Sequence, residues 1–98
     1  MSVQVGMYVV SRECGMVLYG RVDKLLGDDM VSLTRLWRKP YSELDAHDER
    51  DQRPYNHWHR TASMCRPYDF ARGPLHFAHG EKITRQPAVA PAKATRPA

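Results

Sequence analysis

Residues 16–37 read MVLYGRVDKLLGDDMVSLTRLW, two runs rich in aliphatic and β-branched residues on either side of Gly-Asp-Asp. Such runs, bounded by turn residues, are typical of β-strands. Gly followed by Asp suits the tip of a tight hairpin. In the second run Val31, Leu33 and Trp37 have the same parity and therefore share one face of a strand. The stretch predicts an antiparallel hairpin with its tip at Gly27-Asp28-Asp29 and with Trp37 in the core.

A third run precedes this hairpin. Residues 3–10 (VQVGMYVV) are rich in Val and predict a strand, and Ser11-Arg12-Glu13 predicts a polar turn after it. Residues 70–83 hold enough apolar side chains for a closing strand or a short packed segment. The expected fold class is therefore mainly β, with an antiparallel meander in the N-terminal forty residues.

The length of 98 residues allows one domain. We expect a single small β-rich domain over residues 1–85. Residues 86–98 (QPAVAPAKATRPA) have little to bury and predict a flexible, Pro/Ala-rich basic tail. A domain of this size buries only roughly 60–65% of its unfolded surface, which favours a binding module over an enzyme with a deep pocket. We expect no enzymatic activity.

The segment from Ser42 to Arg53 is dense in charge and has almost no apolar residue to bury. It predicts a short charged helix or a solvated loop inserted into the β domain. The acidic and histidine side chains between positions 45 and 51 are acid–base groups in principle. A run this charged is more often a solvated surface than a sheltered catalytic site.

The N-terminal forty residues resemble small SH3-like barrels of the KOW or Tudor type. The residues that support this resemblance are Gly6, Val10, Gly15, Gly20-Arg21-Val22, Gly27-Asp28 and Val31-Ser32-Leu33. The resemblance implies short strands joined by glycine turns, with a sharp bend at the Gly-x-Val step. It also implies a binding module for protein segments or nucleic acid, without choosing between them.

The charge distribution bears on that choice. The chain has 15 Lys and Arg against 11 Asp and Glu, a net charge of +4. Residues 1–80 are nearly neutral, with eleven basic and ten acidic groups, so most of the excess positive charge lies near the C-terminus. Nucleic-acid-binding domains usually carry a basic patch on the folded body. The distribution therefore favours a protein partner over nucleic acid.

Histidines and one cysteine gather in the second half of the chain. They are His57, His59, Cys65, His76 and His79. Imidazole and thiolate are common zinc ligands, but the spacings match no standard zinc finger. We favour surface histidines around a buried Cys65 and expect no cofactor and no metal. The two cysteines, Cys14 and Cys65, are expected to be unbridged thiols.

The segment from Arg53 to Arg60 (RPYNHWHR) interleaves basic and aromatic residues. Tyr, Trp and Arg dominate protein–protein hot spots, and the same types bind single-stranded nucleic acid. The expected binding residues are Arg53, Tyr55, His57, Trp58, His59, Arg60 and Tyr68, with Lys93 and Arg96 from the tail. Trp58 is expected to be more exposed than Trp37.

Together these features predict a non-enzymatic protein-interaction module, a small accessory or structural subunit of a larger assembly. The alternative is an RNA- or single-strand-binding β-barrel with a basic tail. No segment approaches the ~18–20 apolar residues of a membrane span, and the N-terminus lacks the features of a signal peptide. We therefore expect a cytoplasmic protein without a membrane partner. The sequence is compatible with an oligomer.

Overall fold

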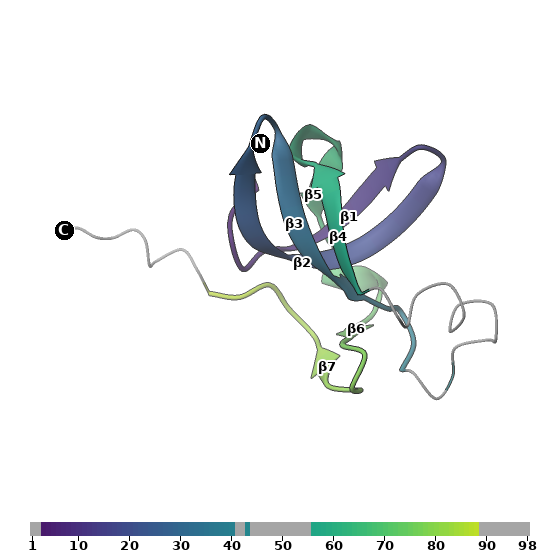
Figure 1. Cartoon of the computed structure of the whole chain (residues 1–98). Coiled ribbons are helices and arrows are strands. Elements are labelled where there is room, and N and C mark those ends of the chain that lie inside the picture. Colours follow the sequence, from purple (N-terminus) through teal and green to yellow (C-terminus); the bar gives the residue numbers. More distant parts are fainter. Residues whose placement is uncertain (1–2, 41–42, 44–55, 89–98) are drawn as a thin grey trace.

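The computed structural model describes residues 3–40, 43 and 56–88. Five strands form one antiparallel sheet in the order β4-β3-β2-β1-β5 (Figure 1). Their bounds are β1 Tyr8–Glu13, β2 Met16–Gly27, β3 Met30–Leu36, β4 His57–Thr61 and β5 Cys65–Pro67. A small second sheet pairs β6 (Leu75–His76) with β7 (Lys82–Ile83), and two 3-10 turns, η2 (Ala62–Met64) and η3 (Phe70–Arg72), lie between strands. The mainly β fold is confirmed.

The predicted hairpin between β2 and β3 is also confirmed. Asp28 and Asp29 at its tip have φ of 52° and 60°, the positive values that a type I′ turn requires at both central residues. Cys14 and Gly15 close the β1–β2 hairpin in the same way, with φ of 53° and 75°. The polar turn predicted at Ser11-Arg12-Glu13 was wrong, because these residues continue β1 and pair with β2.

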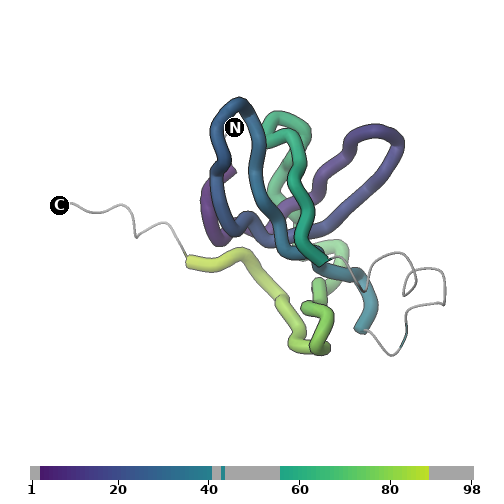
Figure 2. Tube along the Cα trace, in the orientation of Figure 1, coloured from purple at the N-terminus to yellow at the C-terminus, as the bar shows by residue number. Residues whose placement is uncertain are grey.

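The sheet curls strongly, so the β1–β2 and β2–β3 hairpins point apart in Figure 2. At Gly20 an added Cβ would lie 3.0 Å from the Cβ of Leu33 and 3.1 Å from the carbonyl oxygen of Thr34. A side chain at position 20 would therefore require Leu33 or Thr34 to shift by a few tenths of an ångström. Two register shifts follow in β2, between Val22 and Lys24 and between Leu25 and Gly27, and such bulges increase strand twist.

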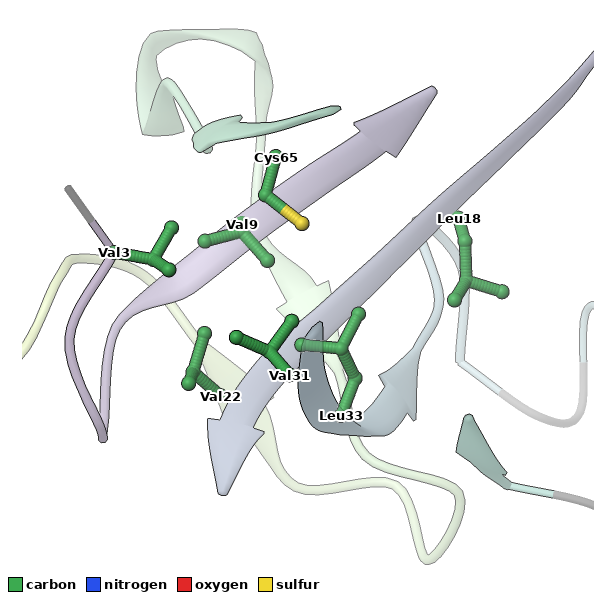
Figure 3. Close-up of a cluster of buried hydrophobic side chains, with 7 residues drawn as sticks. All are labelled: Val3, Val9, Leu18, Val22, Val31, Leu33 and Cys65. Carbon is green, nitrogen blue, oxygen red and sulfur yellow. The ribbon is translucent and has the colours of Figure 1, made fainter. Parts of the chain in front are cut away.

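The inner, concave face of the sheet holds an aliphatic core (Figure 3). This inner cluster consists of Val3, Val9, Leu18, Val22, Val31, Leu33 and Cys65. Met7, Trp58 and Ala62 pack against it. Most of these side chains come from the β1–β2–β3 meander, so the inner cluster is largely a local product of the first forty residues.

The outer face holds a second cluster that is mostly aromatic. It consists of Leu36, Tyr68, Leu75 and Ile83, with Tyr8, Tyr19, Phe70 and Phe77 packed against them. Tyr68 makes edge-to-face contacts with Tyr19 and Phe70, with ring centroids 5.5 and 4.8 Å apart. Here the C-terminal segment that contains β6 and β7 lies against the outside of the sheet (Figure 1).

Gln86 secures this C-terminal segment. Its side-chain oxygen accepts a hydrogen bond from the backbone nitrogen of Tyr8 at 2.8 Å. Its side-chain nitrogen donates to the carbonyl oxygens of Tyr8 and Tyr68 at 2.7 and 3.1 Å. Gln86, which composition assigned to the tail, is thus bound to β1.

The charged insertion predicted between Ser42 and Arg53 lies, except for residue 43, outside the part of the chain that the structure describes, and so do residues 89–98 of the predicted tail. Within the described ranges, no helix has the length and apolarity to cross a membrane.

Candidate functional site

Strand β4 lies at one edge of the five-stranded sheet. In its pairing with β3, Trp58 is opposite Leu33 and Arg60 is opposite Val31. Two backbone hydrogen bonds at the ends of this pairing, Arg35 N to Asn56 O at 2.6 Å and Ala62 N to Asp29 O at 2.7 Å, show which residue pairs are hydrogen-bonded. Because hydrogen-bonded and non-hydrogen-bonded pairs alternate, the peptide groups of Trp58 and Arg60 point toward β3. The peptide groups of His57, His59 and Thr61 point outward, that is, away from β3 in the plane of the sheet.

The outward-pointing N–H of Thr61 already has a hydrogen-bond partner. Its backbone nitrogen donates to Glu13 Oε1 at 2.9 Å, and its hydroxyl bonds to Glu13 Oε2 at 3.2 Å. The outward peptide groups of His57 and His59 have no hydrogen-bond partner among the residues whose placement is described. Within the described part of the chain, this short stretch is a β-edge with free donors and acceptors, the kind of surface that accepts an added strand.

The two faces of β4 differ in character. His57 and His59 are exposed on the outer face, whereas Trp58 is half-buried on the inner face and packs against the inner cluster. Trp37 is only 4% exposed, so the expectation that Trp58 is the more exposed tryptophan is confirmed.

Arg60 is the most unusual residue of the strand. It is only 6% exposed, although its side chain carries a full positive charge. Its guanidinium carbon lies 5.4 Å from the centroid of the Trp58 ring. The Nε and Nη2 atoms are buried and have no hydrogen-bond partner within the described part of the chain. Buried arginine is normally paired, and each unpaired donor needs an explanation.

Of the remaining expected binding residues, the structure describes only Tyr68, which lies in the outer cluster and not at β4. Tyr68 is 4% exposed and donates its hydroxyl to the carbonyl oxygen of Gly73 at 3.0 Å, so it is a core residue of the outer cluster. Burial raises the pKa of its phenol. Arg53, Tyr55, Lys93 and Arg96 lie outside the described residues.

The histidines of the described ranges are not gathered around Cys65. Cys65 is buried on the inner face, where burial raises the pKa of its thiol, whereas His57 and His59 are exposed on the outer face. His79 stacks on Phe77 and lies 3.2 Å from Glu81. Over the described ranges no group of three or more His, Cys, Asp and Glu side chains is placed to hold a metal ion. Cys14 and Cys65 are both free thiols, as expected.

A basic groove on the outer face was not predicted. Arg12 of β1 and Arg66 of β5 line two adjacent hollows, of about 150 Å³ and 240 Å³. Arg72 and Tyr19 line the first of them, and Asp69 is the acidic residue that lines it. The arginines are far apart in the sequence, so only the pairing of β1 with β5 could reveal the groove.

The positive charge of this groove agrees with that of the whole described body. Residues 3–40, 43 and 56–88 contain eleven Lys and Arg against seven Asp and Glu, a net charge of +4. Four of the acidic residues that made residues 1–80 nearly neutral fall between positions 45 and 51, outside the described ranges. The described residues therefore carry more net positive charge than the nearly neutral residues 1–80 indicated.

A third feature is the hollow of about 350 Å³ beside the tip of the β2–β3 hairpin. It is lined mainly by apolar side chains, among them Val3, Leu25, Met30 and Ala62. Leu25 is 56% exposed there. The carboxylate of Asp29, at its rim, is already bonded to the backbone nitrogen and hydroxyl of Ser63 at 3.1 and 2.6 Å.

Comparisons of the chain with protein-family models, with curated proteins and with solved structures find no match.

Proposed function

We propose that this chain is a non-enzymatic protein-interaction module, an accessory or structural subunit that binds an extended segment of another protein along β4. The observation that supports this most is the free edge at His57 and His59. Strand addition to such an edge supplies affinity through main-chain hydrogen bonds, while alternate side chains of the ligand contact the two faces.

We further propose that the curled five-stranded sheet is an SH3-like fold. Four consecutive antiparallel strands, a 3-10 turn between β4 and β5, and the return of β5 to pair with β1 are the features that support the assignment. The sharp bend implied at Gly20 also fits, because β2 there approaches β3 within the reach of a Cβ atom.

A display selection with a library of random peptides tests the function. Peptides selected on the wild-type protein should lose at least about tenfold in affinity on His59→Pro, because proline removes the outward N–H of residue 59. The ladder to β3 should survive, since that N–H does not point toward β3.

His59→Thr is the matched control, because it changes the same side chain and keeps the N–H. It should bind the selected peptides like the wild type. Equal binding by His59→Pro and His59→Thr, with both variants folded, would show that the edge is not the docking site.

The basic groove favours a second candidate function, binding of single-stranded nucleic acid. Two adjacent hollows share Arg12 and Arg66, and Arg72 also lines the first, so this groove brings together several cations that could pair with phosphates. Arg66 is held in place, because its Nη1 donates to the carbonyl oxygens of Ser63 and Cys65 at 2.9 and 3.0 Å. The half-buried ring of Tyr19 offers an aromatic wall beside them.

Fluorescence anisotropy with labelled oligo-dT and oligo-U tests this second function. The double variant Arg12→Gln, Arg66→Gln should weaken binding. It should also reduce the logarithmic slope of affinity against salt by about 0.7 for each phosphate that is no longer neutralised. The double variant Lys24→Gln, Lys82→Gln, at exposed positions of β2 and β7, removes the same number of charges; it is the control and should have a smaller effect. If the control and the arginine double variant weaken binding equally, the charge acts diffusely and the groove is not a site.

A further inference from the structure

We infer that the segment bound along β4 carries an acidic side chain, whose carboxylate pairs with Arg60. The inference rests on the proposed docking at β4 and adds the chemistry of the ligand. Its starting point is the buried guanidinium of Arg60, whose Nε and Nη2 have no hydrogen-bond partner among the residues that the structure describes.

The free protein compensates this charge poorly. The stacking of Arg60 on Trp58 provides one favourable contact, at 5.4 Å to the ring centroid. The carboxylate of Glu13, which bonds to the neighbouring Thr61, has both oxygens engaged there. No ion pair joins Arg60 to an acidic residue of the described ranges. A buried charge without a partner is strongly unfavourable, and an incoming carboxylate would relieve it.

The geometry of strand addition brings a ligand side chain to this charge. A strand that bonds to the outward peptide groups of His57 and His59 places Trp58 and Arg60 in its non-hydrogen-bonded pairs. In such pairs the side chains of the two strands lie closest, with Cα atoms about 4.5 Å apart. The ligand residue opposite Arg60 therefore has its side chain on the inner face, beside the guanidinium.

Glu13 limits where the acidic residue can lie. Because Thr61 is capped by Glu13, the ladder available to a ligand ends at His59. The pair opposite Arg60 is thus the last of the added strand. A single Asp or Glu at one end of an otherwise β-prone ligand is the pattern that fits, and its two oxygens match the parallel donors of a guanidinium.

The peptide selection on the wild-type protein also tests this inference. Among the selected peptides, Asp or Glu should be enriched at one position, next to the residue that pairs with His59. Replacing that residue by Asn or Gln in a synthetic peptide should weaken binding at least about tenfold, a change on the ligand that leaves the protein untouched.

Arg60→Met supplies the matched change on the protein. It keeps a flexible, unbranched side chain, shorter than that of arginine, and removes the charge, so the acidic and amide peptides should bind it equally. The variant should also melt a few degrees above the wild type, because replacing an unpaired buried charge with an apolar group of similar volume stabilises a fold. A residue needed only for packing on Trp58 would show the opposite shift. Arg60→Gln, a second uncharged variant, should likewise lose the preference for an acidic peptide.

The possible outcomes separate the two proposals. Selected peptides that need the β4 edge but show no acidic preference would overturn this inference and leave the docking site standing. Persistence of the acidic preference in Arg60→Met would also overturn it, because the carboxylate would then bind elsewhere. Selected peptides insensitive to His59→Pro would contradict both.

Discussion

The two faces of one sheet are built from different materials. The inner cluster is aliphatic and comes mainly from consecutive strands of the N-terminal meander. The outer cluster is largely aromatic and joins Tyr8, Tyr19 and Leu36 to side chains between residues 68 and 83. One cluster is therefore local in sequence, while the other exists only after the chain has returned to the sheet.

This difference assigns different tasks to the two faces. The outer cluster is closed by its own C-terminal segment, which covers the aromatic side chains and is secured by Gln86. On the inner face beside β4, Trp58 is half-buried, and two buried donors of Arg60 lack polar partners in the described part of the chain. The buried donors without a partner among the described residues thus lie at the edge of the inner face. There a bound partner could supply the missing hydrogen bonds.

The largest expected effect concerns the two tryptophans. Trp37→Ala should lower the free energy of unfolding by about 3–5 kcal/mol, because Trp37 is almost fully buried. Trp58→Ala should cost clearly less, since its ring is half-buried, although its packing on the inner cluster makes some loss unavoidable. The same variant should lose about 2 kcal/mol or more of affinity for peptides selected on the wild type. Urea denaturation of both variants would measure the difference, and a larger loss for Trp58→Ala would reverse the assigned roles.

A leucine from each cluster sharpens the comparison. Leu33 and Leu75 are both fully buried, the first in the inner and the second in the outer cluster. Each Leu→Ala change should cost about 3 kcal/mol. Leu26→Ala, at a 43% exposed position, should stay within about 0.5 kcal/mol of the wild type.

The two leucine variants should differ in how far the damage spreads. Leu33→Ala should weaken amide protection throughout the meander, whereas Leu75→Ala should mainly release the β6–β7 segment. Equal loss of protection in the meander for both variants would show that the local cluster depends on the non-local one.

Gln86 tests how the outer cluster is closed. Gln86→Ala removes three hydrogen bonds to β1 and to Tyr68 and should cost about 1–2 kcal/mol. Deleting residues 89–98 should leave thermal stability almost unchanged, because that segment has little apolar surface to bury. A melting temperature that falls more for the deletion than for Gln86→Ala would show that the tail contributes to the fold.

The smallest effect is expected at alkaline pH. Burial raises the pKa of the Cys65 thiol in the inner cluster and of the Tyr68 phenol in the outer one. Both groups hold their protons more tightly in the folded protein than in the unfolded one. Their contribution to the free energy of unfolding is therefore complete at neutral pH. It is lost as pH rises above about 8.5 for the thiol and about 10 for the phenol.

Cys65→Ala should remove the earlier part of this decline and Tyr68→Phe the later part. Cys14→Ser is the control, because Cys14 is exposed. Chemical denaturation at a series of pH values would separate the two contributions, and a decline unchanged in Cys65→Ala would contradict the role of the thiol.

The meander could be predicted from sequence because its determinants are local. Val31, Leu33 and Trp37 alternate along one strand, and Asp28-Asp29 forms the turn that Gly-Asp indicated. The end of β1 was misplaced because Ser11-Arg12-Glu13 is polar. Ser11 is nevertheless buried, and Glu13 is needed to cap β4, so tertiary contacts outweigh local composition there.

The candidate site was predicted only in part for the same reason. Residues 57–60 were singled out by their composition, but composition cannot tell which peptide groups face outward, since this depends on the pairing with β3. It likewise could not place Tyr68 in the core, because the partners Tyr19 and Phe70 lie on different segments. The basic groove forms only because β1 pairs with β5. No local sequence pattern predicts this pairing.

Amide hydrogen exchange along β4, followed by NMR in the free protein, tests the central claim most directly. The amides of Trp58 and Arg60, bonded to β3, should exchange slowly, whereas those of His57 and His59 should exchange within the time of the first spectrum. Thr61, bonded to Glu13, should be intermediate. This alternation would establish the free edge without any knowledge of the partner. Protection of His57 and His59 equal to that of Trp58 would show that the edge is already covered and would contradict the proposed docking site.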